Sequence, residues 1–77
     1  MRKIRMARVM EVMDHEGREK VYFVPGDTVR IETWTGGWYK GTISGINSDN
    51  LVMYGKNGKD FVVKFREIDH IRKERWV

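Results

Sequence analysis

The chain has 77 residues and a mass of 9.2 kDa, the size of one small domain spanning residues 1–77. Its formal net charge is +4, and it has no cysteine, which excludes disulfides, thiolate metal ligands and a cysteine nucleophile. Eight glycines against a single alanine, Ala7, disfavour a helix-rich fold.

The first 24 residues are predicted to form an extension of the domain. Val21–Val24 is rich in strand-favouring residues and follows the turn-like residues 14–17. This pattern predicts a β-hairpin that pairs residues 9–13 with 19–24. Met6, Val9, Met10 and Met13 also fit the spacing of a short helix, which stays the alternative. The hairpin is the preferred interpretation.

From Pro25 onward the chain predicts short strands separated by turns. In residues 28–33, Val29 and Ile31 alternate with Arg30 and Glu32, as expected for a strand with one buried face. The turns are expected at 25–27, 35–37, 47–50 and 55–59. The expected strands are 28–33, 38–46, 51–54 and 61–66, followed around 68–71 by a short last strand or a single helical turn.

Two interior glycines, Gly41 and Gly45, lie in the longest expected strand. Such glycines mark a bend, a bulge or a close backbone approach. A small antiparallel sheet must also curl to cover its apolar face. The fold class is therefore predicted to be mainly β, with a small, strongly bent antiparallel barrel of about five strands at 27–72 and the extension at 1–24.

One stretch of the chain resembles a known sequence pattern. The run Gly41-Thr42-Ile43-Ser44-Gly45-Ile46-Asn47, followed by Asn50–Met53, resembles the first motif of Sm-like proteins (Sm, LSm and Hfq), with Asn47 where that pattern has aspartate. Val63–Ile71 is similar to the second motif. The opening Gly26–Ile31 is also similar to other SH3-like barrels, including the KOW type. The resemblance covers 27–72 and implies an SH3-like or Sm-like small barrel.

The resemblance also implies sites. Base-binding residues would lie in two loops, at Asn47, Ser48, Asp49 and Asn50, and at Arg66 and Glu67. Asn50 would hydrogen-bond a base edge, and Arg66 would contact phosphate or stack on a base. Subunits would pair through the strand edges Phe61–Arg66 and Ile68–Arg72 to form a homo-oligomer.

Aromatic residues gather around one expected turn. Trp34, Trp38 and Tyr39 flank Thr35-Gly36-Gly37. Exposed rings on a β-surface can stack unpaired bases. Two alternatives stay open: a cage for a methylated cation, as in Tudor-type barrels, and local packing at the end of the barrel.

The positive charge lies at the two ends of the chain. Arg2, Lys3, Arg5 and Arg8, with Arg72, Lys73 and Arg75, would form one phosphate-binding patch if the termini meet. The alternative is an ordinary solubilising surface. Residues 27–63 carry no net charge, which argues against a basic groove on the barrel itself.

No catalytic pattern emerges from the sequence. His15 and His70 adjoin acidic residues, but neighbours along a strand point to opposite faces, and no phosphate-loop, GxSxG or HExxH spacing occurs. We therefore expect no enzyme activity, no cofactor and no metal. We expect a cytoplasmic protein without membrane association, because no apolar run suffices for a signal peptide or a spanning helix.

The predicted function is binding of RNA or single-stranded DNA. The residues predicted to bind are Trp34, Trp38, Tyr39, Asn50, Arg66, Arg72, Lys73 and Arg75. The alternative is a protein–protein interaction module or a small structural subunit.

Overall fold

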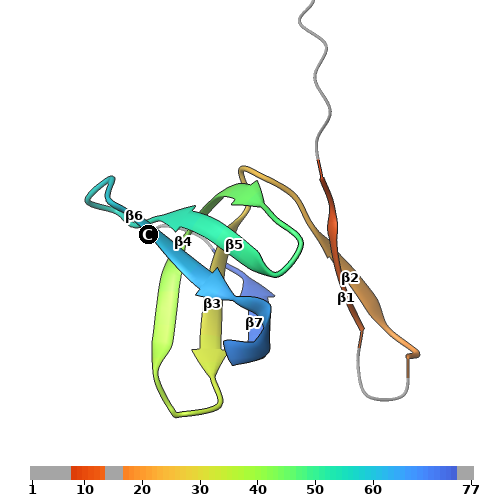
Figure 1. Cartoon of the computed structure of the whole chain (residues 1–77). Coiled ribbons are helices and arrows are strands. Elements are labelled where there is room, and N and C mark those ends of the chain that lie inside the picture. Colours follow the sequence, from red (N-terminus) through yellow and green to blue (C-terminus); the bar gives the residue numbers. More distant parts are fainter. Residues whose placement is uncertain (1–7, 14–16, 75–77) are drawn as a thin grey trace, which may run out of the picture.

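Two antiparallel sheets make up the structure, a computed structural model that describes residues 8–13 and 17–74 (Figure 1). The smaller sheet is a hairpin of β1 and β2, and the larger has five strands in the order β6-β5-β4-β3-β7. A 3-10 helix, η1, precedes β7. The bounds are β1 Met10–Met13, β2 Lys20–Phe23, β3 Thr28–Thr33, β4 Trp38–Ile46, β5 Asn50–Tyr54, β6 Asp60–Lys64, η1 Phe65–Glu67 and β7 Ile68–Lys73.

The N-terminal hairpin is confirmed. Met10 pairs with Phe23 and Val12 with Val21, so these four side chains share one face of the hairpin. The alternative of a helix is wrong over the residues that the structure describes, because Met10–Met13 is a strand. Met6 lies outside the described residues. Val21, Tyr22 and Phe23 favour the extended backbone because β-branched and aromatic side chains pack well on a pleated surface.

The strands expected after Pro25 are confirmed with changes at their ends. Strands 28–33 and 38–46 have the predicted bounds, and β5 starts one residue earlier than predicted. The expected strand 61–66 is wrong at its end, since Phe65 and Arg66 belong to η1. The amide of Phe65 donates to the Asp49 carbonyl at 2.9 Å, next to the last pair of the β5–β6 ladder, Asn50 with Lys64, and the chain turns into η1 from there. The last element is a strand, β7, and it extends to Lys73.

The larger sheet is strongly bent but not closed. The register between β4 and β5 shifts between Ile43 and Gly45, which marks a bulge. At Gly41 a Cβ atom would lie 2.7 Å from the Tyr54 carbonyl oxygen, so glycine allows the close approach of two backbones. Strands β6 and β7 remain the two edges of the sheet, and no ladder between them closes it in the described part of the chain.

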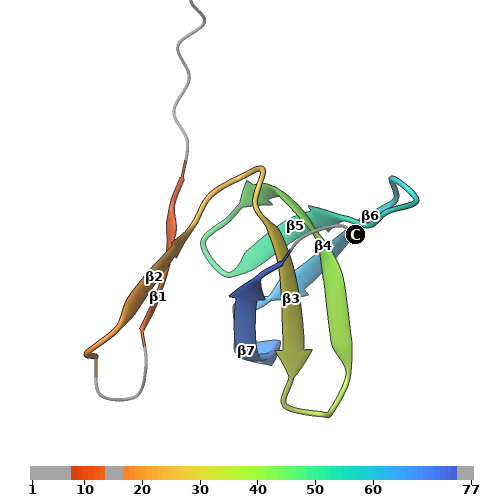
Figure 2. The ribbon, with the colours of Figure 1, turned by 180° about the vertical axis from the view of Figure 1, so that it is seen from behind.

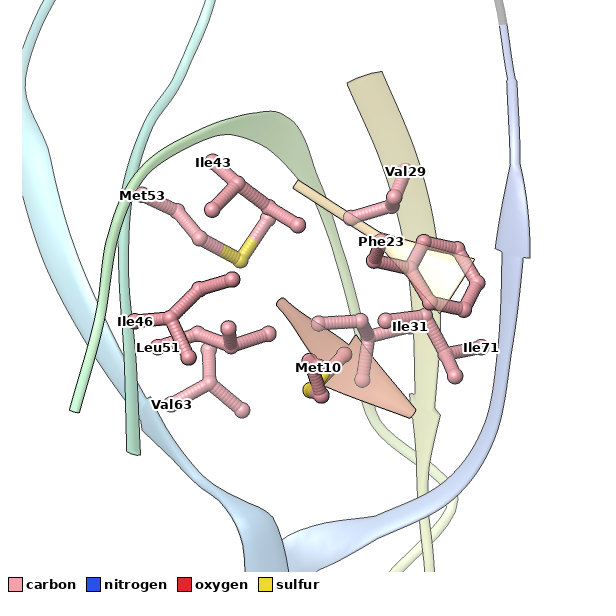
Figure 3. Packing of buried hydrophobic residues seen from close by; sticks show 10 residues of the cluster. All are labelled: Met10, Phe23, Val29, Ile31, Ile43, Ile46, Leu51, Met53, Val63 and Ile71. Atoms are coloured by element: carbon pink, nitrogen blue, oxygen red, sulfur yellow. The ribbon is translucent and has the colours of Figure 1, made fainter. Parts of the chain in front are cut away.

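The core lies between the sheet and the hairpin. Val29 and Ile31 of β3 are fully buried, as their alternation with Arg30 and Glu32 predicted. Figure 3 shows Met10 and Phe23 of the hairpin among the side chains of the larger sheet. The hairpin therefore contributes to the same core. The ten buried apolar residues are Met10, Phe23, Val29, Ile31, Ile43, Ile46, Leu51, Met53, Val63 and Ile71.

Candidate nucleic-acid interface

Trp38 lies exposed on the outer face of the larger sheet. The guanidinium carbon of Arg30 is 4.5 Å from the centre of its ring, close enough for a cation–π contact. Register explains the contact, because Trp38 pairs with Glu32, two residues along β3 from Arg30 on the same face. Arg30 Nε also lies 3.7 Å from the Glu32 carboxylate. Trp38 remains 57% exposed, which leaves ring surface for a ligand.

Three cationic side chains lie in one row across the outer face. Arg30 on β3 pairs with Lys40 on β4 and with Arg72 on β7. All three face away from the core because Val29 and Ile31, which alternate with Arg30, are buried. We call Lys40, Arg30 and Arg72 the cationic row. The neutral centre of the sequence argued against a basic groove on the sheet. Cross-strand pairing nevertheless brings together cationic side chains that are far apart in the chain, beside the acidic Glu32.

A groove lies where the β3–β4 turn meets η1. It has a volume of about 490 Å³ and is lined by Thr33, Trp34, Thr35, Gly37, Trp38, Tyr39, Arg66 and Glu67. The Trp34 amide donates to the Glu67 carbonyl at 3.3 Å, which joins the turn to η1. Gly36 has φ +90°, which the turn needs and which other residues rarely adopt. Trp34 is 66% exposed beside this groove. We call it the aromatic groove.

The predicted aromatic cluster is divided between two faces. Tyr39 pairs with the buried Ile31 and stacks on Phe61, with ring centroids 5.6 Å apart. Trp38, its neighbour in sequence, contacts Arg30 on the outer face. The structure therefore brings Trp34, Tyr39 and Arg66 together at the aromatic groove. Trp38 also lines this groove, while its ring lies under Arg30 beside the cationic row.

Asn50 is engaged in the turn between β4 and β5. Its side-chain oxygen accepts from Asn47 Nδ2 at 2.8 Å, and its Nδ2 donates to Asp49 Oδ1 at 2.6 Å. The Asn47 amide also donates to the Asn50 carbonyl at 2.9 Å. Asn47, Ser48 and Asp49 are exposed in this turn. The predicted contact of Asn50 with a base stays a prediction, and these hydrogen bonds give its amide a structural role.

The predicted terminal patch is described only in part. Lys73 Nζ lies 3.9 Å from Asp27 and 5.8 Å from the centre of the Phe23 ring, so an acid partly balances its charge. Arg72 belongs to the cationic row, and Arg8 is exposed ahead of β1. The remaining members of the predicted patch, Arg2, Lys3, Arg5 and Arg75, lie outside the described residues.

The histidines do not form a metal site within the described residues. His70 is exposed on β7 and pairs with Glu32, while His15 lies outside the described residues. No group of three or more His, Asp or Glu side chains that could hold a metal ion occurs among residues 8–13 and 17–74. In the same part of the chain, no helix has the length and apolar character needed to cross a membrane.

Sequence reasoning missed Arg30 and Lys40. Alternation already placed Arg30 on the face opposite Val29, and the Thr35–Gly37 turn implied that residues 28–33 and 38–46 pair. Together these observations could have placed Lys40 near Arg30. Arg72 could not have been added in this way. It pairs with Arg30 across the ladder of β3 and β7, which are distant in sequence, and no local pattern specifies the register of that ladder.

Scans of the chain against protein-family models, curated proteins and solved structures find no match.

Proposed function

We propose that this chain binds single-stranded nucleic acid, RNA or DNA, on the outer face of β4, β3 and β7, without catalysis. The observation that carries the proposal is the cationic row beside the exposed ring of Trp38. Phosphates would lie along the row, and a base would stack on Trp38. Figure 2 shows the three strands that carry this face, β3, β4 and β7.

The spacing of the row suits a phosphate backbone. Neighbouring strands lie about 4.8 Å apart, so three adjacent strands present three positive charges over about 10 Å. Arg30 and Arg72 can each hold a phosphate with two parallel hydrogen bonds. Arg30 also covers one side of the Trp38 ring, so a base on the remaining surface would complete a stack of guanidinium, indole and base.

Single strands are favoured over a duplex because Trp38 offers a flat, exposed ring. A base must leave its stack and its pairing partner to lie on this ring, which costs little in a single strand. The row also reads no base edge, so we expect weak sequence preference. Glu32, 3.7 Å from Arg30 Nε, lowers the net charge of the face and limits the affinity.

The test is a titration with a fluorescently labelled oligouridine at several salt concentrations. We expect saturable binding whose affinity falls as salt rises, with a slope of about 0.7 for each phosphate contacted. Arg30→Gln and Arg72→Gln should each weaken binding and each lower that slope. Lys59→Gln, in the turn between β5 and β6, is the matched control that removes one charge elsewhere and should leave the slope unchanged.

The proposal would be overturned by two results. One is the absence of binding at low salt by a chain that circular dichroism shows to be folded. The other is an equal loss of affinity in Lys59→Gln and Arg30→Gln, which would indicate attraction by net charge alone. Trp38→Leu adds a further check, because a lost stack should weaken binding without changing the salt slope.

The aromatic groove favours a second candidate function, a protein-interaction module. Its walls carry Trp34 and Tyr39, with one basic and one acidic side chain, Arg66 and Glu67. This near-neutral, aromatic surface suits a polypeptide better than a polyanion. Trp34→Leu would distinguish the two functions, since it should weaken a partner protein's binding and leave oligouridine affinity within about twofold of wild type.

For the fold, we propose that the larger sheet is an open relative of the small SH3-like barrels, among which the Sm-like proteins belong. Five antiparallel strands, the bulge in β4 and the pairing of β3 with the last strand support this relationship. The Gly41–Met53 sequence pattern supports it independently. Taken alone, this relationship would predict a homo-oligomer formed through the edges of β6 and β7.

A further inference from the structure

A second groove lies between the hairpin and the η1–β7 part of the larger sheet, beside the shared core. It has a volume of about 710 Å³ and is lined by Met10, Glu11, Val12, Met13, Glu19, Val21, Phe65, Ile68, Asp69, His70 and Ile71. Figure 2 shows β7 on the side of the sheet that faces the hairpin. We call this space the hairpin groove. It is distinct from the cationic row and from the aromatic groove.

The hairpin groove is bordered by two strands that each have an unpaired edge in the described part of the chain. Four consecutive residues of β1 and four of β7 line it. Val21 of β2, which shares a hairpin face with Val12, lines it as well. Within residues 8–13 and 17–74, β1 pairs only with β2 and β7 pairs only with β3, so each of the two strands has an unpaired edge there. Such edges accept an added strand through backbone hydrogen bonds.

The walls of the hairpin groove define the chemistry of that strand. Val12, Phe65 and Ile68 are partly exposed apolar residues packed against the core. The charged residues of the lining are all acidic: Glu11, Glu19 and Asp69. Glu11 lies 3.5 Å from Lys20, and the structure describes no ion pair for Glu19 or Asp69. The groove therefore suits an extended segment that alternates apolar with basic residues.

The chain carries such a segment in its own sequence. Lys3-Ile4-Arg5-Met6 alternates basic with apolar residues, and no acidic residue occurs before Glu11. As a strand, it would place Ile4 and Met6 on one face and Lys3 and Arg5 on the other. The first ten residues contain no Gly, Pro, Asn or Asp, the residues that form tight turns. A reversal just before β1 is therefore disfavoured, and a second copy is the better source of the strand.

We propose that the N-terminal segment of one copy, residues 3–6, adds as a strand in the hairpin groove of a second copy, and that the exchange is reciprocal. Ile4 and Met6 would contact the apolar floor, and Lys3 and Arg5 would face Glu19 and Asp69. Two identical contacts related by a two-fold axis make a closed dimer. This dimer occupies the edge of β7 and takes the place of an oligomer through β6 and β7. It leaves the outer face with the cationic row uncovered.

The test is the molar mass of the full chain in solution, with charge reversals on each side of the proposed contact. The wild-type chain should have about twice the monomer mass of 9.2 kDa. Lys3→Glu with Arg5→Glu should raise the dimer dissociation constant about tenfold or more. Glu19→Lys with Asp69→Lys should do the same. Asp60→Lys, an exposed reversal on β6, is the control that should leave the mass unchanged.

Mixing the two double variants shows whether the contact is made between copies. One variant has an acidic segment and an acidic groove, and the other has a basic segment and a basic groove. Each alone should be monomeric, while an equimolar mixture should form a heterodimer in which both contacts are complementary. A wild-type monomer at every concentration would overturn the proposal. So would a mixture that stays monomeric, or a dimer that either reversal leaves intact.

Discussion

Trp38 and Tyr39 are consecutive in β4, and their rings lie on opposite faces of the sheet. Arg30 covers Trp38 at 4.5 Å on the outer face, whereas Tyr39 stacks on Phe61 at 5.6 Å. The two rings therefore cannot bind one base between them. We expect Trp38→Leu to weaken oligouridine binding by about 1–3 kcal/mol, the usual contribution of one base stack.

Trp34→Leu is the matched control for this prediction. It removes an indole that is somewhat more exposed, 66% against 57%, from the neighbouring turn, away from the Arg30 contact. Its oligouridine affinity, measured by fluorescence anisotropy, should stay close to that of wild type. Equal losses in the two variants would show that the base lies in the aromatic groove and not on the outer face.

Gly41→Ala is expected to destabilise the fold by about 1–3 kcal/mol, a typical cost of overpacking. Its Cβ would meet the Tyr54 carbonyl oxygen at 2.7 Å and Phe61 Cζ at 3.1 Å, so backbone as well as side chain must move. The measurement is urea denaturation followed by tryptophan fluorescence.

Gly45→Ala provides the comparison within the same strand. A Cβ there would lie 3.8 Å from the nearest atom, Cβ of Val52, which is an ordinary contact. We expect a change of less than about 0.5 kcal/mol, as for a site without a clash. A cost as large as that of Gly41→Ala would mean that β4 and β5 approach each other more closely at Gly45 than the structure has it.

The hairpin should unfold together with the larger sheet. Phe23 is fully buried in the shared core, and removal of such a ring costs about 3–5 kcal/mol. A chain of this size has a total stability of about 4–12 kcal/mol. Phe23→Ala should therefore shift the midpoint seen by the tryptophans of the larger sheet, although Phe23 lies in β2.

Val21→Ala is the control for this prediction, because it truncates a side chain of the same hairpin that is not fully buried in the shared core. Val21 is 44% exposed on the same strand, so its truncation should cost less than about 1 kcal/mol. An unchanged tryptophan transition in Phe23→Ala would show that the hairpin and the sheet unfold independently.

Asn50→Ala should lower stability by about 0.5–1.5 kcal/mol and leave nucleic-acid affinity unchanged. The substitution removes the hydrogen bonds from Asn47 and to Asp49, which are exposed and therefore contribute modestly. Thermal unfolding and the oligouridine titration, made on the same sample, test both parts. A specific loss of affinity in a chain of normal stability would restore Asn50 as a base-contacting residue.

Local sequence patterns predicted most of the strands. Alternation at Val29 and Ile31 identified the buried face of β3, and the turn residues located the ends of β4. The end of β6 was not predictable from the pattern at Phe61–Arg66, because the contact of Phe65 with Asp49 depends on the pairing of β5 with β6.

The candidate site was predicted less well than the fold. Trp34, Tyr39 and Arg66 meet at one groove, although Arg66 is distant in sequence. The division of Trp38 from Tyr39 follows from strand alternation and could have been inferred. The cationic row could not be completed from sequence, because the partner of Arg30 on β7 depends on a register set by the whole sheet.

The pairing of β3 with β7 also constrains the order of assembly. Arg30 and Arg72 are about forty positions apart, so this ladder closes a long loop and belongs to the slower events of folding. During synthesis, β7 leaves the ribosome after β1 to β6 have already left it. The cationic row is therefore complete only once β7 has been synthesised, and a nascent chain that ends at η1 has two of the three cations of the row and an unpaired edge on β3.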